Sequence, residues 1–293
     1  MKFGPEYTGL RMDRAIAERL SASGQQVSVS ETKAALKAGS IKVNGRFCAP
    51  GTRVQENDDF QLDSFVPKSA WTVKPAPELL CRSAILYEDD DWLALDKPSG
   101  VHTVPLKNLE EDTLLGAAIA RDERIAQSGP TLEGGALHRL DYGTSGVVLF
   151  AKKAAGRALV REAFDRHEVK KEYLAVVLDE TAVWTSPRRV EIALDTNKRR
   201  VRPAEDGLLA VTNVNLVRRN ESGHTLLCAE TQYGRRHQIR VHLATCGTPI
   251  LGDEVYGDVD TFFRLALHAS KLTLPSGLSI SAPMSQDLGD LLL

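Results

Sequence analysis

The sequence predicts an α+β fold, in which a few helices pack on a mixed, largely antiparallel sheet. Seven short segments rich in Val, Ile, Leu and Tyr are bounded by turn residues, as strands are. Three longer segments have the period of helices, and they do not alternate regularly with the strands as in a doubly wound sheet. The expected strands are 85–88, 92–95, 147–151, 173–178, 190–194, 209–217 and 225–231, and the expected helices are 112–125, 154–167 and 236–246.

The length of 293 residues exceeds that of most single domains, so two domains are expected, the larger one with a full hydrophobic core. Hydrophobic residues make up 42% of the chain and charged residues 26%, which is typical of globular proteins and excludes global disorder. No stretch reaches the ~20 apolar residues of a membrane helix, and residues 1–6 lack the apolar core of a signal peptide. We therefore expect a cytoplasmic protein with no membrane partner, and a monomer.

Metal ligation is not indicated by the cysteines or the histidines. The four cysteines are scattered without a Cys-x-x-Cys pair, which argues against a zinc knuckle or a disulfide framework. His237 and His242 are five positions apart, so they share no face of a helix and lie on opposite faces of a strand. Without a third ligand nearby, this pair predicts no metal site.

The N-terminal 65 residues are expected to form a small domain of two helices and a hairpin. Apolar residues at every fourth position predict the first helix, and an Asn-Gly pair is the strongest short signal for a hairpin turn. The pattern rests on Met12, Ile16 and Leu20 for the first helix, Ser30 or Thr32 as the cap of the second, Gly39 as its end and Asn44-Gly45 as the turn.

Residues 66–84 are expected to form a linker between this domain and a larger one over residues 85–293. The segment has no hydrophobic period, and its prolines, which include Pro67, Pro75 and Pro77, favour a semi-extended backbone. A linker of this kind predicts that the two domains fold independently.

The chemistry of the chain is indicated by the run His138-Arg139-Leu140-Asp141-Tyr142-Gly143-Thr144-Ser145-Gly146, which leads into the apolar stretch 147–151. A carboxylate in a Gly/Thr/Ser turn against a strand is held by backbone groups, as a reactive group on a rigid element is. The pattern favours Asp141 as a nucleophile; a surface turn that caps a strand is the alternative for such a turn alone. The run resembles the signature of the RluA-type pseudouridine synthases, which isomerise uridine in structured RNA.

Two further runs resemble the same family. Lys171-x-Tyr173 enters an expected strand, and the family's tyrosine at this place lies against the target base, a role for which a planar ring is suited by stacking. The run from Gly234 to Leu243, followed by Gly-x-Pro-Ile-x-Gly-Asp and Tyr-Gly, contains Arg240, whose family counterpart pairs with the catalytic aspartate. A buried carboxylate beside a guanidinium, as Asp141 would be, is expected to stay ionised. One departure is Tyr142, where relatives more often have Arg or Lys.

The resemblance implies a pseudouridine synthase fold with a central cleft over residues 85–293, and an isomerase that needs no cofactor. It implies catalytic roles for Asp141, Tyr173 and Arg240. Attack on the sugar, attack on the pyrimidine ring and formation of a glycal remain open as mechanisms. Residues expected to contact the substrate are Arg139, which could hold a flipped phosphate, and His138, Lys171, Lys97, His237 and Gln238.

The expected macromolecular partner is RNA, with ribosomal RNA of the large subunit favoured over transfer RNA. The N-terminal domain resembles the S-four-like RNA-binding domain, whose helices and hairpin present a basic face; a purely structural domain is the alternative. Residues 186–202 hold six basic and two acidic residues, a local charge of +4 that fits either an RNA contact or a solvated strand edge. The expected RNA-binding residues are Lys33, Lys37, Lys42, Arg46, Lys198, Arg199, Arg200, Arg235 and Arg236.

Two other functions are compatible with parts of this pattern. A non-catalytic RNA-binding or ribosome-assembly factor could keep the fold, although intact Asp141, Tyr173 and Arg240 argue against it. A glycosidic hydrolase could use Asp141 with a second carboxylate from Asp89-Asp90-Asp91, although an acidic run between two strands is more simply a turn.

Overall fold

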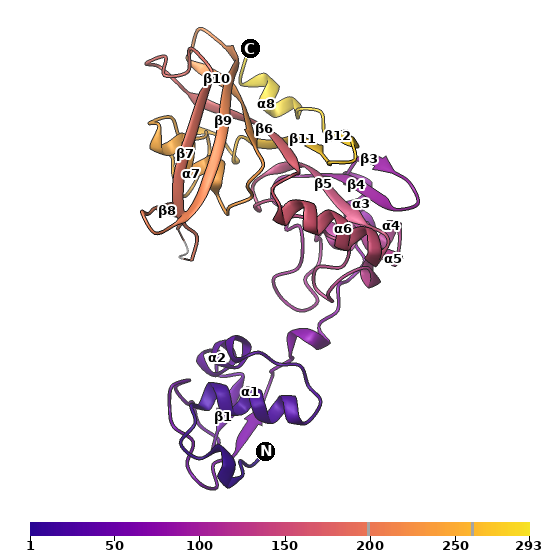
Figure 1. The fold of residues 1–293 in the computed structure, drawn as a ribbon, viewed down its shortest axis with the longest axis vertical. Helices are drawn as coiled ribbons and strands as arrows, with labels where there is room; N and C mark the ends of the chain where they lie inside the picture. Colours follow the sequence, from indigo (N-terminus) through magenta and orange to yellow (C-terminus); the bar gives the residue numbers. More distant parts are fainter. Residues whose placement is uncertain (198–199, 259–260) are drawn as a thin grey trace. The chain divides into compact units, whose positions relative to one another are not determined.

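The structure, a computed structural model of the chain, describes residues 1–197, 200–258 and 261–293. It divides into two compact units, each with its own core (Figure 1). The small unit comprises Met1–Val73 with Lys107–Leu109, and the large unit comprises Lys74–Leu106 with Glu110–Leu293. The boundary at Val73 lies inside the segment expected as a linker.

The small unit contains two α-helices packed on a short two-stranded sheet. Its first helix is the one that the spacing of Met12, Ile16 and Leu20 predicts, and all three side chains are fully buried. The elements are η1 (Pro5–Tyr7), α1 (Met12–Ala22), α2 (Val29–Ala38), β1 (Ile41–Val43), β2 (Phe60–Leu62) and η2 (Lys68–Ala70).

The second helix begins earlier than the sequence pattern predicts. Ser28, and not Ser30 or Thr32, is its N-cap, because Ser28 and Glu31 form a capping box: Glu31 N donates to Ser28 Oγ at 3.2 Å, and Ser28 N donates to the Glu31 carboxylate at 3.0 Å. The predicted end is confirmed, since Gly39 has a φ of 76° and closes the helix.

The turn at Asn44-Gly45 forms, but the hairpin does not. Both residues have positive φ, and Arg46 N donates to Val43 O at 2.9 Å to close the turn. The chain then leaves the sheet, and β1 pairs antiparallel with β2, so that Ile41 lies opposite Leu62. An Asn-Gly pair therefore specified a tight turn here and not the strand that follows it.

Half of the expected linker is ordered as part of the large unit. Helix α3 (Pro77–Arg82) begins with Pro77 at its first turn, and Leu79 is only 1% exposed. Ala76 N donates to Gly116 O at 2.9 Å and fastens this helix to the next one. Six residues are too few for a helical period to show in the sequence, which explains why this element was not predicted.

The large unit is built on a sheet of ten strands within the described residues, in the order β3-β4-β5-β11-β6-β10-β9-β7-β8 with β12 paired to β11 (Figure 1). All neighbours are antiparallel except β5 and β11, which are parallel, so the predicted mixed, largely antiparallel sheet is confirmed. The strands are β3 (Ile85–Glu88), β4 (Trp92–Lys97), β5 (Ser145–Ala151), β6 (Lys170–Leu178), β7 (Arg188–Asp195), β8 (Arg202–Pro203), β9 (Leu208–Arg219), β10 (His224–Thr231), β11 (Leu267–Thr273) and β12 (Ser279–Ser281).

The three helices expected in the large unit form, one of them as two helices, and a short helix over Gln286–Asp290 was not predicted. The helix expected over 112–125 is two helices, because Asp122 leaves helical geometry at φ −151° and its carboxylate accepts from Arg124 N at 3.1 Å. Within the described segments, none of the helices has the length and apolar character that a bilayer-spanning helix needs. The helices are α4 (Leu114–Arg121), α5 (Arg124–Gln127), α6 (Ala154–Asp165), α7 (Gln238–Thr245) and α8 (Gln286–Asp290).

Strand β11 joins the two parts of the sheet and was not predicted. It lies between β5 and β6, and its pairing with β5 brings Gly146 so close to Ala269 that a Cβ on Gly146 would lie 2.2 Å from the Ala269 carbonyl oxygen. Glycine is therefore required at this crossing, where φ is +114°. The residues just before β5, which include Asp141, are thereby fixed at the centre of the sheet.

Candidate active site

A cavity of about 860 Å³ opens in the large unit beside the end of β5. Its wall brings together the three runs that the sequence singles out, although Asp141 and Arg240 are 99 positions apart. Residues from these runs that line it include His138, Arg139, Asp141, Tyr142, Lys171, Tyr173, Arg235, Arg236, His237, Gln238 and Arg240.

Asp141 lies in a tight turn that Thr144 N closes by donating to Asp141 O at 3.0 Å. The side chain of Asp141 is 28% exposed and lines the cavity, so it is more open than the buried carboxylate that the sequence reasoning assumed. An exposed carboxylate in a rigid turn can meet a substrate without rearrangement.

The turn is held from the side by the loop that follows β4. Lys97 Nζ donates to the carbonyl of Tyr142 at 3.2 Å, and Gly100 N donates to the same oxygen at 2.9 Å. Ser99 Oγ donates to the Gly143 carbonyl at 2.7 Å. Three separate donors thus fix the backbone directly after Asp141.

Lys97 was expected to contact the substrate, and the structure contradicts this. The side chain is fully buried, lies outside the cavity wall, and also donates to the carbonyls of Pro98 and Val101 at 2.9 and 2.7 Å. Burial lowers the pKa of Lys97 to about 7, against the raising effect of the Asp141 charge. Lys97 is a positioning residue for the Asp141 turn.

Arg240 projects from the first turn of α7 toward two carboxylates. Its Nη1 lies 3.2 Å from Asp141 Oδ2, while its Nε and Nη2 form a bidentate pair with Asp253 at 2.8 and 2.7 Å. The fork geometry to Asp253 leaves one edge of the guanidinium directed at Asp141. Arg240 therefore presents a fixed positive charge to the carboxylate that lines the cavity.

Asp253 is a functional residue to which the sequence reasoning gave no role. It is 1% exposed and also accepts from the N–H groups of Val255 and Tyr256. Burial alone would raise the pKa of Asp253, but the hydrogen bonds and charge of Arg240 hold it below its usual value. Its place in the Gly-x-Pro-Ile-x-Gly-Asp run was the signal that could have identified it.

Tyr173 comes from β6 and lines the cavity. Burial, together with the nearby charge of Asp141, raises the pKa of its hydroxyl, so the side chain is a neutral phenol at physiological pH. In the part of the chain that the structure describes, this hydroxyl makes no hydrogen bond with protein, and it is available to a bound ligand.

Lys171 is a buried cation of the cavity wall. It is 7% exposed, its Nζ lies 5.5 Å from the centre of the Phe164 ring, and no carboxylate among the described residues pairs with it. Burial, followed by the nearby charge of Arg235, lowers its pKa to about 8. An unpaired cation in a cavity is suited to an anionic group of a ligand.

The two histidines that were expected to contact the substrate, His138 and His237, are held by protein contacts. His138 Nε2 accepts from Leu149 N at 3.2 Å, and burial, with the charges of Lys171 and Arg161, lowers its pKa to about 3, so the ring is neutral. His237 is hydrogen-bonded through Nδ1 to the Tyr256 hydroxyl at 3.0 Å, and its Nε2 lies 3.9 Å from Asp141 Oδ2.

Gln238 was expected to contact the substrate, but its amide is used within the protein. Nε2 donates to Val211 O, Thr212 Oγ1 and Thr231 Oγ1, each at 2.9 Å, and Oε1 accepts from Arg235 N at 3.3 Å. With only 4% of its surface exposed, Gln238 fastens α7 to β9 and β10.

The residues expected to bind RNA lie in different settings. In the small unit Lys33, Lys37 and Arg46 are exposed, whereas Lys42 is paired with Asp63 at 2.5 Å. In the large unit Arg139 is exposed at the cavity. Arg200 packs on the Tyr256 ring, Arg235 packs on the Tyr233 ring, and Arg236 donates to Thr196 O at 3.1 Å, while Lys198 and Arg199 lie outside the described residues.

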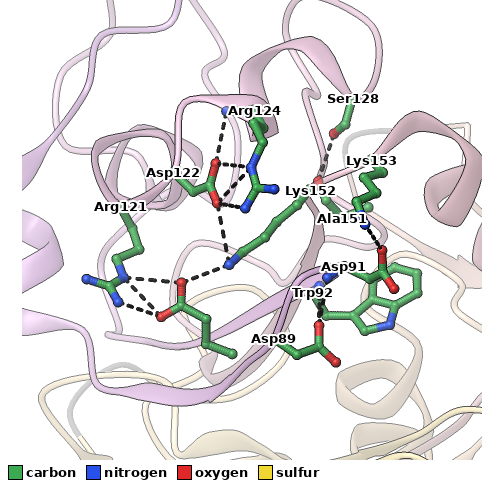
Figure 2. Close-up of polar contacts among 11 residues, drawn as sticks. Asp89, Asp91, Trp92, Arg121, Asp122, Arg124, Ser128, Ala151, Lys152 and Lys153 are labelled. Carbon is green, nitrogen blue, oxygen red and sulfur yellow. Dashed lines mark hydrogen bonds and ion pairs between the residues drawn. The ribbon is translucent and has the colours of Figure 1, made fainter.

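The acidic run Asp89-Asp90-Asp91 forms a turn, and this turn lies outside the wall of the cavity. Figure 2 shows Asp89 accepting from the N–H groups of Asp91 and Trp92, at 2.9 and 2.7 Å, and Asp91 paired with Lys153 at 2.7 Å. None of the three lines the cavity as described. This run therefore supplies no second carboxylate for a glycosidic hydrolase at the cavity.

Comparison with known proteins shows the family of this chain. A family model described as RNA pseudouridylate synthase matches residues 91–245. A protein of Xanthomonas campestris named ribosomal large subunit pseudouridine synthase D is 31% identical over 303 residues, which cover 96% of this chain and 87% of the relative. An uncharacterized RNA pseudouridine synthase of Bacillus subtilis is 32% identical over 237 residues, which cover 79% and 76% of the two chains. The chain therefore belongs to the RNA pseudouridylate synthase family, and the predicted isomerase activity on RNA is confirmed.

Solved structures with the same fold support the architecture. Human RNA pseudouridylate synthase domain containing 1 aligns with a TM-score of 0.58 at 23% identity, over 71% of this chain and 87% of that one. Human RNA pseudouridylate synthase domain containing 4 aligns with a TM-score of 0.57 at 22% identity, over 73% of this chain and 93% of that one. The predicted pseudouridine synthase fold is confirmed.

Proposed function

We propose that Asp141 is the nucleophile with which this enzyme isomerises uridine, and that the substrate is ribosomal RNA of the large subunit. The observation that supports the first part is the setting of its carboxylate. Asp141 is open to the cavity and paired at 3.2 Å with an arginine that a second, buried carboxylate holds in place. A fixed neighbouring cation favours the ionised, nucleophilic form of a carboxylate.

The reaction exchanges one bond of the ribose for another. The bond between N1 of uracil and C1′ of the ribose breaks, a bond between C5 and C1′ forms, the proton on C5 leaves to solvent, and N1 takes up a proton. Asp141 assists by bonding to C1′, by bonding to the ring, or by removing a proton to give a glycal, and it is regenerated at the end. The three routes share this overall balance.

The neighbouring residues divide the remaining tasks. Tyr173, a neutral phenol in the wall, offers a flat face to the uracil that has left its stack, at the few-kcal/mol cost of base flipping. Arg139 is exposed beside Asp141, where it can hold the phosphate of the flipped nucleotide. Lys171 adds a second positive charge for the backbone. Together they would keep the freed base in place while it rotates.

The choice of ribosomal RNA is supported by the relatives, several of which are named ribosomal large subunit pseudouridine synthase D. We also propose that residues 1–65, which lie in the small unit, act as an S-four-like RNA-binding domain of an enzyme whose catalytic domain is the large unit. The exposed side chains of Lys33, Lys37 and Arg46 support this.

Mapping pseudouridines tests the proposed substrate. RNA from cells with and without the gene is compared at every uridine, and RNA from the deletion strain is then treated with the purified protein. We expect large-subunit sites that vanish without the gene and return with the protein. Sites found only in transfer RNA would overturn the choice of substrate, and sites that the Asp141→Asn protein restores at the wild-type rate would overturn the nucleophile.

A further inference from the structure

Tyr142, the residue after Asp141, presents an exposed ring at the catalytic cavity. It lines the cavity and is 57% exposed, and its backbone carbonyl is fixed by Lys97 Nζ and Gly100 N. The proposed reaction assigns this exposed ring no part.

The Tyr142 ring is supported by a second ring. The His102 imidazole lies with its centroid 4.8 Å from that of Tyr142, at an interplanar angle of 54°. His102 Nδ1 lies 2.5 Å from Glu110 Oε1, and Glu110 Oε2 accepts from Leu106 N at 2.6 Å. The two rings are therefore ordered before any ligand arrives, and Leu106, 62% exposed, extends the same apolar rim of the cavity.

We propose that the Tyr142–His102 pair is a stacking subsite for the unpaired base that neighbours the target uridine in the RNA. This rests on the proposed function, because it assumes that the target uridine enters the cavity at Asp141. An exposed aromatic face binds a nucleobase by stacking, and it does so without regard to base identity. The subsite would select RNA in which the neighbouring nucleotide is unstacked.

The target uracil is a poorer occupant for this surface than its neighbour. A base that is detached from its ribose must be kept from water, and Tyr173 offers a partly buried ring for it, whereas more than half of Tyr142 is exposed. A phosphate is also a poorer occupant, because the phenol of Tyr142 offers it no positive charge, whereas exposed Arg139, three positions earlier, does.

Another tyrosine of the cavity wall provides a comparison. Tyr233 packs against His167 with a centroid distance of 4.5 Å, but Arg235 also lies over its ring at 5.8 Å, and the side chain is partly buried. Its ring is already used for packing within the protein. Tyr142 differs in having His102 as its ring contact among the described residues and a largely exposed surface.

The test is a double-mutant cycle between the ring and the base. The RNA is a hairpin excised from large-subunit ribosomal RNA around a mapped uridine, with the base on its 5′ or 3′ side present or replaced by an abasic ribose. The proteins are wild type, Tyr142→Phe, Tyr142→Leu and Tyr142→Arg, each with its melting temperature measured. The readout is kcat/KM for pseudouridine formation, separated into kcat and KM.

We expect wild-type protein to lose about tenfold in kcat/KM, mainly through KM, when one of the two neighbouring bases is removed. Relative to wild type, Tyr142→Leu should have a kcat/KM lower by the same factor on the intact hairpin and an equal kcat/KM on the abasic one. Tyr142→Phe should match wild type on both hairpins. Tyr142→Arg should have the same kcat/KM whether the base is present or absent. Equal losses for Tyr142→Leu on both hairpins, or an unchanged rate for wild type on both abasic hairpins, would overturn the subsite. If wild-type protein modifies no RNA, the proposed function itself fails.

Discussion

At the scale of single residues, Asp141 affects the protonation of Tyr173. Burial raises the pKa of the Tyr173 hydroxyl and the charge of Asp141 raises it further, so the phenol keeps its proton at physiological pH. A flat, neutral ring beside an anion is a suitable place for a uracil that is about to be detached.

The role of this ring is tested by Tyr173→Phe and Tyr173→Leu. Phenylalanine keeps the stacking face, so we expect it to retain most of kcat/KM, whereas leucine should lose roughly 10–100-fold because base stacking is worth ~1–3 kcal/mol. Single-turnover rates of pseudouridine formation measure both variants. Equal, severe loss in both would assign the hydroxyl a part in proton transfer, and wild-type rates in both would contradict the placement of Tyr173 at the substrate.

Lys171 predicts a pH dependence of RNA binding. A lysine is cationic below its pKa and neutral above it, and burial lowers the pKa of Lys171 to about 8. The affinity of wild-type protein for RNA should therefore fall as pH rises from 7 to 9. Lys171→Arg should remove this fall, since arginine stays charged, and Lys171→Met should bind weakly at every pH. Filter binding from pH 7 to 9 measures the RNA affinity of the three proteins. If the affinity of wild type is constant over this range, Lys171 makes no phosphate contact.

The sequence indicated which residues would meet at the site better than it indicated what each would do. The contact between Asp141 and Arg240 could be predicted, because the runs that contain them are specific to the family. The roles of Lys97 and Gln238 could not: both are buried and bind backbone or hydroxyl groups of the protein. Burial depends on strands distant in the sequence, so no local pattern revealed it.

At the scale of elements, an ion network ties β3, the α4–α5 corner and the end of β5 (Figure 2). Lys152 Nζ lies 2.8 Å from Glu88 and 3.4 Å from Asp122, and its side chain is 5% exposed. Arg121 pairs with Glu88 at 2.8 Å and Arg124 with Asp122 at 2.6 Å. Lys152 is the shared partner of the two carboxylates, and Lys153, its neighbour in the chain, points to the separate carboxylate of Asp91.

These two adjacent lysines make a matched pair of variants. Lys152→Met should destabilise the protein by about 1–3 kcal/mol at pH 7, because it leaves partly buried carboxylates short of a partner. Lys153→Met should cost at most about 0.5 kcal/mol, since its pair with Asp91 is exposed. Urea unfolding measures both, and equal costs would show that the network contributes no more than a surface pair.

The pH dependence of this network has a defined sign. The Arg124 hydrogen bond, with a smaller contribution from Lys152, lowers the pKa of Asp122 to about 2, below its ordinary value of 3.8. A carboxylate whose pKa is lower in the folded protein than in the unfolded chain stabilises the fold at pH values above its unfolded-state pKa. This stabilisation is lost as the pH falls through the folded-state pKa. The difference between wild type and Lys152→Met should therefore shrink from pH 4 toward pH 2. A difference that stays constant to pH 2 would contradict the part assigned to these carboxylates.

The elements that were predicted are those with a strong local period, and the elements that were missed depend on distant partners. Strands such as β5 and β6 are rich in β-branched or apolar residues and were found. Strand β11 contains His268, which is 1% exposed and hydrogen-bonded to Ser145 Oγ at 3.0 Å, so it reads as polar in sequence although it is central in the sheet. The partner of β1 was missed because it comes from residues 60–62.

At the scale of the whole molecule, the division at Val73 predicts that the catalytic unit folds by itself. Deletion of residues 1–73 should leave a cooperative melting transition and a measurable rate. The small domain, residues 1–65, holds nine basic and eight acidic residues, so its loss should lower RNA affinity only several-fold, through the loss of tethering.

The salt dependence of binding distinguishes the two basic regions. Replacement of Lys198, Arg199 and Arg200 by Gln should flatten the plot of log Kd against log salt, by ~1 unit of slope per lost phosphate contact, and the truncation should leave the slope nearly unchanged. A flatter slope for the truncation, with no change for the triple variant, would make the N-terminal domain the main RNA anchor and residues 186–202 a solvated strand edge.

The claim that Asp141 is the nucleophile is tested most directly by tritium release from RNA labelled at C5 of uridine, since every route to pseudouridine expels that hydrogen. Asp141→Asn removes the charge and nucleophilicity at nearly constant shape. The account predicts that this variant binds RNA within about threefold of wild type and melts at a similar temperature, while tritium release falls to background. Release by purified Asp141→Asn at a rate near that of wild type would contradict it.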